Sequence, residues 1–180
     1  LNTRYNDTQI CTYSNSDCFN INYAISKIQR NEPILINCKP LYEYKPKKKD
    51  YEETVGGEEL TIEEKEERNI NKFSVSLFDK VMCKKNLNKE LLKTLGLDES
   101  FKISNGDVGY ISGIKYIKDG QTYTINTNEE LKDFNDQGRK VDDIEVLINF
   151  PHIGDDLGFK LDSKLYSELF SLAFCTTIHK

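Results

Sequence analysis

The chain has 180 residues, of which 37% are hydrophobic and 31% charged, and its formal net charge is −5. A chain of this size buries roughly two-thirds of its unfolded surface, so we expect one domain over residues 1–180 with its own core. The acidic balance argues against general nucleic-acid binding. No apolar run approaches the ~18 residues of a membrane-spanning helix, so we expect a soluble protein without a membrane span.

The first predicted elements are a helix and an edge strand. Apolar residues at 21, 24, 25 and 28 follow the spacing of an amphipathic helix, which Pro33 would end. Residues 34–44 then alternate between apolar and polar positions, as a strand does. Pro40 has no backbone N–H for a ladder, which predicts an edge strand or a bulge at that point.

Residues 45–69 form a charged excursion, here called the acidic arm. It opens with Lys45-Pro46-Lys47-Lys48-Lys49, which resembles a nuclear import signal or a phosphate-contacting patch and is equally typical of a solvated hairpin tip. Residues 50–68 then carry nine acidic residues against two basic ones, a local net charge of −7. Such a run cannot bury enough apolar area to offset its ordering entropy. We expect a solvated loop or a docking surface for a basic partner.

The middle of the chain predicts a strand and a helix. Residues 72–77 alternate as a strand, and 77–82 fit a helical turn, so we expect the strand to pass into a helix there. Asn86 or Asn88 would cap a following helix that carries Leu91 and Leu92 and ends at Gly96.

The clearest unit is a hairpin, a helix and a strand between residues 108 and 150. Asp119-Gly120 predicts a tight turn between two antiparallel strands, and Gly113 in the first of them predicts a bulge or a close backbone contact. Thr127 with Glu130 fits a capping box for a helix, and residues 144–150 alternate as a strand. This order of elements is compatible with a ubiquitin-like β-grasp unit in the C-terminal half, as it is with many α+β folds.

The last predicted element is a helix over 163–177 that is apolar around much of its circumference. Most helices of this kind lie in the core, and a second role as an interface with another chain is the alternative. Its candidate partner-binding residues are Leu169, Phe170 and Phe174.

Residue types for catalysis are sparse in this sequence. His152 lies in a loop before Asp155-Asp156, where the imidazole and carboxylates would suit a divalent metal, although the same residues also make an ordinary turn. A cysteine nucleophile would require Cys38, Cys83 or Cys175 to face His152, and all three sit in apolar segments typical of buried thiols.

The five cysteines are an odd number. Cys11 and Cys18 bracket a polar stretch that suits a small disulfide loop, and Asn6-Asp7-Thr8 matches a glycosylation sequon. The chain begins with Leu1, which leaves open a targeting segment removed before it. We favour an intracellular protein, in the cytoplasm or nucleus. A small secreted or viral surface domain, with a Cys11–Cys18 bridge and a glycan on Asn6, is the alternative.

Together these patterns predict an α+β fold with a mainly antiparallel sheet and three to four helices. The expected function is a non-enzymatic protein–protein interaction module, a subunit of a larger assembly, without catalytic residues, metal or cofactor. It would bind through the acidic arm, a strand edge or the last helix. A metal-assisted hydrolase using His152, Asp155 and Asp156 is the alternative. The predicted partner-binding residues are Glu58, Glu59, Glu63, Glu64, Glu66, Glu67, Leu169, Phe170 and Phe174.

Overall fold

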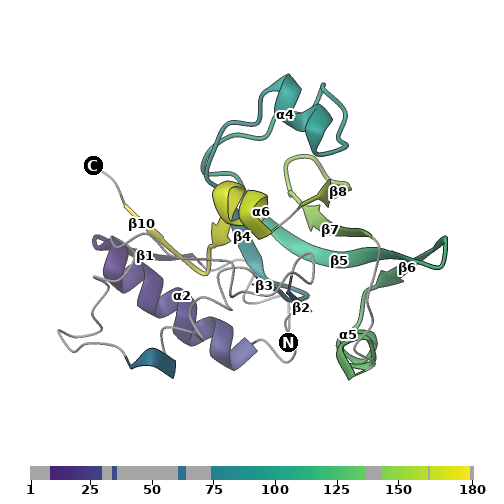
Figure 1. Cartoon of the computed structure of the whole chain (residues 1–180). Coiled ribbons are helices and arrows are strands. Elements are labelled where there is room, and N and C mark those ends of the chain that lie inside the picture. Colours follow the sequence, from purple (N-terminus) through teal and green to yellow (C-terminus); the bar gives the residue numbers. More distant parts are fainter. Residues whose placement is uncertain are drawn as a thin grey trace.

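The protein is built around one mainly antiparallel sheet with helices at its faces and ends (Figure 1). A computed structural model of the chain describes residues 9–29, 34–35, 61–63, 74–136, 143–161 and 163–178. The described elements include four helices and a six-stranded sheet of order β8-β7-β5-β4-β9, in which β6 also pairs with β5. The predicted α+β class is therefore confirmed.

The strands of the sheet are β4 Lys80–Cys83, β5 Val108–Lys118, β6 Gln121–Ile125, β7 Asp143–Asn149, β8 Asp156–Lys160 and β9 Phe170–Leu172. Strand β5 is the longest, and each of its neighbours runs antiparallel to it. It pairs with β7 along one edge, while β4 and β6 share its other edge. The hairpin β5–β6 therefore stands out beyond β4 at one end of the sheet (Figure 1).

Gly113 lies at a bulge in β5, as predicted. The register with β7 shifts between Ile111 and Gly113. A Cβ at this position would lie 2.8 Å from the Asn126 Oδ1 atom and 3.0 Å from the Leu147 Cδ1 atom, so a larger residue would force these side chains to move. Glycine thus suits the close packing where the strand bends toward the hairpin.

One face of the sheet carries the apolar core. Ile111, Ile114 and Val146 are fully buried on this face. An aromatic row crosses the core, with ring-centroid distances of 6.2 Å for Phe150–Phe159, 5.4 Å for Phe159–Phe170 and 5.8 Å for Tyr166–Phe170. Because these rings come from β8, β9, helix α6 (Ser163–Leu169) and the end of β7, the row ties distant parts of the chain together.

Two helices begin as their sequences predict. Helix α4 (Lys89–Thr94) starts at Asn88, whose side chain accepts a hydrogen bond from the Leu91 N–H, and Gly96 follows it with a φ of 77°. Helix α5 (Asn128–Asp136) starts with the capping box, since the Thr127 Oγ1 accepts from the Glu130 N–H and the Glu130 carboxylate accepts from the Thr127 N–H. Hydrogen bonds to the Glu130 carboxylate from the Asn126 N–H and then the Thr127 N–H hold the pKa of Glu130 below its ordinary value.

Two predictions of secondary structure are wrong, and one strand was not predicted. Residues 77–82 form a turn and β4 rather than a helical turn. The turn expected around His152 is present over 151–153, but strand β8 begins at Asp156. The predicted helix over 163–177 ends at Leu169, after which β9 pairs with β4 and β10 (Cys175–Thr177) follows. A strand buried on both faces also has successive apolar residues. The many apolar residues between 163 and 177 therefore did not distinguish a helix from strands.

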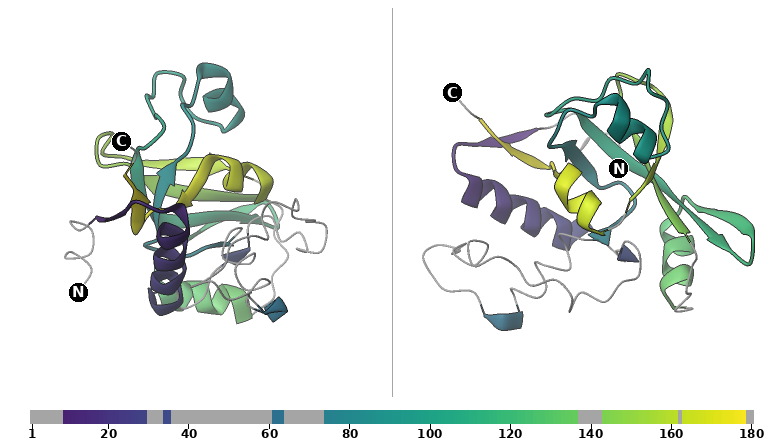
Figure 2. Two further views of the ribbon diagram at one scale, coloured as in Figure 1. Left: turned by 90° about the vertical axis from the view of Figure 1, so that its left-hand side faces the viewer. Right: turned by 45° about the horizontal axis from the view of Figure 1, so that its top comes forward.

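A second, smaller unit joins the two ends of the described chain. Strand β1 (Ile10–Thr12) pairs in parallel with β10, and helix α2 (Asn15–Gln29) packs beside them. Figures 1 and 2 show this unit on the side of the molecule opposite the β5–β6 hairpin. Strands β2 (Ile34–Leu35) and β3 (Ser74–Val75) form a separate antiparallel pair.

The side of helix α2 that is buried differs from the predicted apolar stripe. Its buried residues are Asn22 and Ser26, whereas Ile28 on the predicted apolar stripe is 82% exposed. The reason is that α2 lies against the edge of β10, where backbone N–H and C=O groups require polar partners. The strand edge predicted near Pro40 lies outside the described residues, as does most of the acidic arm.

Candidate functional site

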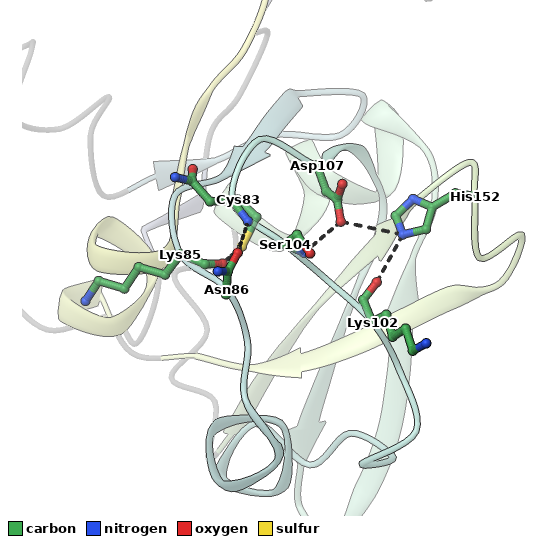
Figure 3. A network of polar contacts seen from close by, with 8 residues as sticks. Cys83, Lys85, Asn86, Lys102, Ser104, Asp107 and His152 are labelled. Atoms are coloured by element: carbon green, nitrogen blue, oxygen red, sulfur yellow. Dashed lines mark hydrogen bonds and ion pairs between the residues drawn. The ribbon is translucent and has the colours of Figure 1, made fainter.

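His152 holds two loops together (Figure 3). It follows β7, and its Nε2 atom lies 3.2 Å from the Lys102 carbonyl oxygen and 3.6 Å from the Asp107 Oδ2 atom. The same Asp107 oxygen accepts a hydrogen bond from the Ser104 N–H at 2.7 Å. The histidine therefore fastens the turn after β7 to the loop that precedes β5.

The predicted metal trio is not brought together. His152 faces Asp107, while Asp156 begins β8 and accepts a hydrogen bond from the Asn149 side chain at 3.0 Å. Within the described ranges, no group of three or more His, Cys, Asp or Glu side chains is placed to hold a metal ion. The described residues therefore do not assemble the metal site expected from His152, Asp155 and Asp156, and a hydrolase activity stays an untested prediction.

The thiols follow the sequence predictions in part: Cys83 and Cys175 are buried, as expected. Cys83 is fully buried and donates to the Lys85 carbonyl oxygen at 3.0 Å, and burial raises its pKa, which disfavours the nucleophilic thiolate. Cys11 and Cys18 are both free, so the predicted bridge between them is not formed. Cys18 instead lies beside Cys175, a neighbour 157 residues away that no sequence pattern indicated. Cys38 lies outside the described residues.

The predicted partner-binding residues fall into three groups. Leu169 and Phe170 are buried in the core, and Phe174 is half-buried, so the first two are not displayed on the surface of the single chain. Glu63 is exposed in the described segment 61–63, beside Ile62, which is 75% exposed. Outside the described residues lie Glu58, Glu59, Glu64, Glu66 and Glu67. A role of any of them in binding stays a prediction.

The β5–β6 hairpin is the best-defined candidate surface. Asp119 and Gly120 both have positive φ, 51° and 74°, as a two-residue hairpin turn requires. The register joins Lys118 to Gln121, Tyr116 to Tyr123 and Ile114 to Ile125. Pairs that flank a two-residue turn exchange both backbone hydrogen bonds, and this pattern repeats every second residue.

The register determines which backbone groups of β6 point outward. Residues 121, 123 and 125 direct their N–H and C=O groups toward β5. Thr122 and Thr124 therefore direct theirs away from it. Among the strands that the structure describes, β6 pairs with β5 alone. The outer edge of β6 thus presents the hydrogen-bonding groups of these two threonines.

An aromatic cluster supports the hairpin from one face. Tyr123 stacks on Tyr116 with centroids 5.1 Å apart, and Tyr116 contacts Phe134 of α5 at 4.8 Å. Tyr116 and Phe134 are buried, whereas Tyr123 is 40% exposed beside the open edge. The cluster holds β6 against the sheet and leaves one aromatic side chain next to the position that an additional strand would occupy.

The other end of the sheet is covered differently. Strand β8 pairs with β7, and the backbone N–H of Lys160 donates to the Leu95 carbonyl oxygen at 3.3 Å. The segment after α4 therefore occupies part of the β8 edge. The sequence identified the hairpin through Asp119-Gly120, yet no local pattern shows which strand edge remains open, because that depends on distant segments.

The comparisons with known proteins give no relative. No family model matches the chain, and neither a curated protein nor a solved structure matches it. The β-grasp comparison thus stays a prediction of topology. In the described part of the chain, no helix combines the length and apolar character needed to span a membrane.

Proposed function

We propose that this protein is a protein-interaction module that binds an extended segment of another protein along the outer edge of β6. The observation that supports this proposal is the open hydrogen-bonding edge of Thr122 and Thr124. An added strand gains its affinity from backbone hydrogen bonds and its specificity from alternate side chains.

The side chains of β6 suit this mode of binding. Open strand edges are commonly protected by lysine, proline or a covering segment. Strand β6 has the sequence Gln-Thr-Tyr-Thr-Ile, with neither lysine nor proline. It is therefore chemically compatible with a further strand.

The partner segment has a definite expected chemistry. Its residue opposite Tyr123 would lie on the α5 face, where an aromatic or β-branched side chain would pack on the exposed tyrosine ring. The acidic arm, with a net charge of −7 over residues 50–68, favours a partner that is basic outside this segment.

A proline substitution tests the edge without breaking the hairpin. Thr124→Pro removes an N–H that points away from β5, whereas Thr124→Val retains it and is the matched control. We would select extended peptides from a displayed random library against the whole chain, then titrate the selected peptide into each variant. We expect affinity about tenfold weaker for Thr124→Pro and within about twofold of the parent for Thr124→Val.

Amide hydrogen exchange locates the bound peptide independently. Protection of the Thr122 and Thr124 amides on binding is the expected result, and unchanged exchange together with equal affinity of both variants would contradict the proposal. Sedimentation of the free protein tests the remaining alternative, which is that a second copy of the chain binds at this edge. A dimer that Thr124→Pro dissociates would mean that a second copy of the chain occupies this edge.

A further inference from the structure

The side chains of Cys18 and Cys175 meet where α2 rests on β10. The Cys18 Sγ atom lies 3.1 Å from the Cys175 carbonyl oxygen and donates to it. Burial raises the pKa of the Cys18 thiol, and the neighbouring Cys175 raises it further. One turn after Cys18, the Asn22 side chain donates to the Cys175 carbonyl oxygen and accepts from the Cys175 N–H, both at 2.8 Å.

The remaining cysteine of this unit points elsewhere. In the parallel register Cys175 lies beside Ile10, and Cys11 lies beside Thr176. Because side chains alternate along a strand, Cys11 projects from the face opposite to Cys175. Thr12 confirms this orientation, since its Oγ1 atom lies 3.9 Å from the Cys175 Sγ atom.

Joining the two sulfur atoms would leave the backbone of β10 satisfied. The hydrogen bonds of the Cys175 thiol to described residues are long, 3.9 Å to the Thr12 Oγ1 atom and 4.0 Å to the Thr176 carbonyl oxygen, so losing them costs little. The bond would remove the Cys18 S–H that donates to the Cys175 carbonyl oxygen. That oxygen would keep the Asn22 donor, so no buried acceptor would lose its last partner.

A covalent bond would strengthen the attachment of α2 to β10. The described elements that α2 mainly contacts are β10 and β1, and its buried residues are the polar Asn22 and Ser26. None of the apolar side chains of α2 is fully buried; Phe19, Ile21, Tyr23 and Ile25 are half-buried. A segment attached in this way opens at a lower free energy than the core.

We propose that Cys18 and Cys175 are a disulfide-forming pair that locks α2 to β10 when the protein meets a small-molecule disulfide such as oxidised glutathione. The bond would link two residues 157 positions apart in sequence. It would fix helix α2, near the start of the described chain, to strand β10, near its end. This covalent attachment of α2 to β10 is here called the clasp.

The chemistry balances through two thiol–disulfide exchanges. The Cys18 thiol loses its proton, and the thiolate attacks one sulfur of oxidised glutathione, forming a mixed disulfide and releasing one glutathione thiolate. The Cys175 thiol then loses its proton and attacks the Cys18 sulfur, which releases the second glutathione. The two protein thiols are thereby oxidised by two electrons, and one oxidised glutathione becomes two reduced molecules.

Peptide mapping of the whole chain tests the pairing directly. The protein is incubated with oxidised glutathione, and its remaining thiols are alkylated. It is then cleaved before Asp17 and after Arg30, so that Cys11, Cys18 and Cys38 fall in different peptides. We expect a peptide that links Cys18 to Cys175 as the main product, both in the parent and in the control Cys11→Ser. A Cys11–Cys18 link, or the absence of any link to Cys175, would overturn the proposal.

Thermal unfolding tests the clasp. Oxidation should raise the Tm of the parent and of Cys11→Ser by about 5–10 °C, because a long closed loop restricts the unfolded chain. Cys18→Ser should show no such rise. A linked parent whose Tm and α2 amide exchange do not differ from those of the reduced protein would overturn the locking role. Because the peptide mapping is also done on the parent protein, it identifies the paired cysteines even if a variant fails to fold.

Discussion

The sheet body and the unit of α2, β1 and β10 are stabilised by different kinds of contact. In the body, Phe159 and its aromatic neighbours belong to a large buried apolar cluster, with a few buried polar residues such as Asp79 beside it. At the α2 junction the buried residues are Asn22 and Ser26, and Asn22 makes hydrogen bonds to the backbone of β10. The body thus depends mainly on apolar burial, whereas polar pairing with the β10 backbone helps to determine where α2 lies.

The largest predicted effect belongs to the body. Phe159→Ala removes the ring that joins Phe150 to Phe170, and we expect it to lower the free energy of unfolding by about 3–5 kcal/mol. Urea denaturation measures this change. Tyr13→Ala, at a side chain 81% exposed, is the control and should change stability by less than about 0.5 kcal/mol.

The next effect tests the polar junction. Asn22→Ala leaves the buried Cys175 N–H without its acceptor, and we expect a loss of about 1–3 kcal/mol with faster amide exchange in α2. Ile28→Ala, on the exposed stripe of the same helix, should change stability by less than about 0.5 kcal/mol. If Ile28→Ala instead lowered stability more than Asn22→Ala, apolar contacts would hold α2. The contrast between the sheet body and the α2 unit would then be wrong.

A smaller effect follows from the thiol of Cys18. Burial, and then the neighbouring Cys175, raise the pKa of Cys18 from 9.0 to about 11. Between these two pH values the unfolded chain has lost a proton that the folded chain retains, so stability falls as pH rises from about 9 to about 11. The parent should therefore lose more stability over this range than Cys18→Ser, measured by urea denaturation. Equal losses would show that the thiol is not desolvated at the junction.

The smallest effect on stability is expected from the acidic arm. Deleting residues 50–68 should change the free energy of unfolding by no more than about 1 kcal/mol, because loop length enters closure entropy only logarithmically. The deletion should slow the binding of a basic partner, and high salt should slow binding to the parent in the same way. Binding that neither the deletion nor salt affects would show that the arm is passive.

Local patterns predicted the elements whose signals lie within a few residues. The turn at Asp119-Gly120, the capping box of Thr127 and Glu130, and the cap at Asn88 are each formed by neighbouring groups, and each was confirmed. Strand β9 was missed because its partner β4 lies far away in the chain, and an apolar run alone fits a helix equally well. Strand β8 was missed although it follows its partner β7 closely, because the residues at its start are also typical of a turn.

The same distinction separates the candidate sites. Sequence spacing suggested Cys11 with Cys18 and His152 with Asp155 and Asp156, because neighbours in sequence are the pairs that spacing can propose. The structure instead placed Cys18 beside Cys175, and His152 beside Asp107, across long separations in sequence.

By itself the sequence determined the α+β class, the hairpin and the caps of two helices, because turn and capping chemistry depends on adjacent residues. Only the tertiary structure decided which face of α2 is buried, which strand edge remains open and which thiols meet. Those outcomes depend on backbone groups that must find partners after the chain has folded back on itself, and no stretch of sequence contains that information alone.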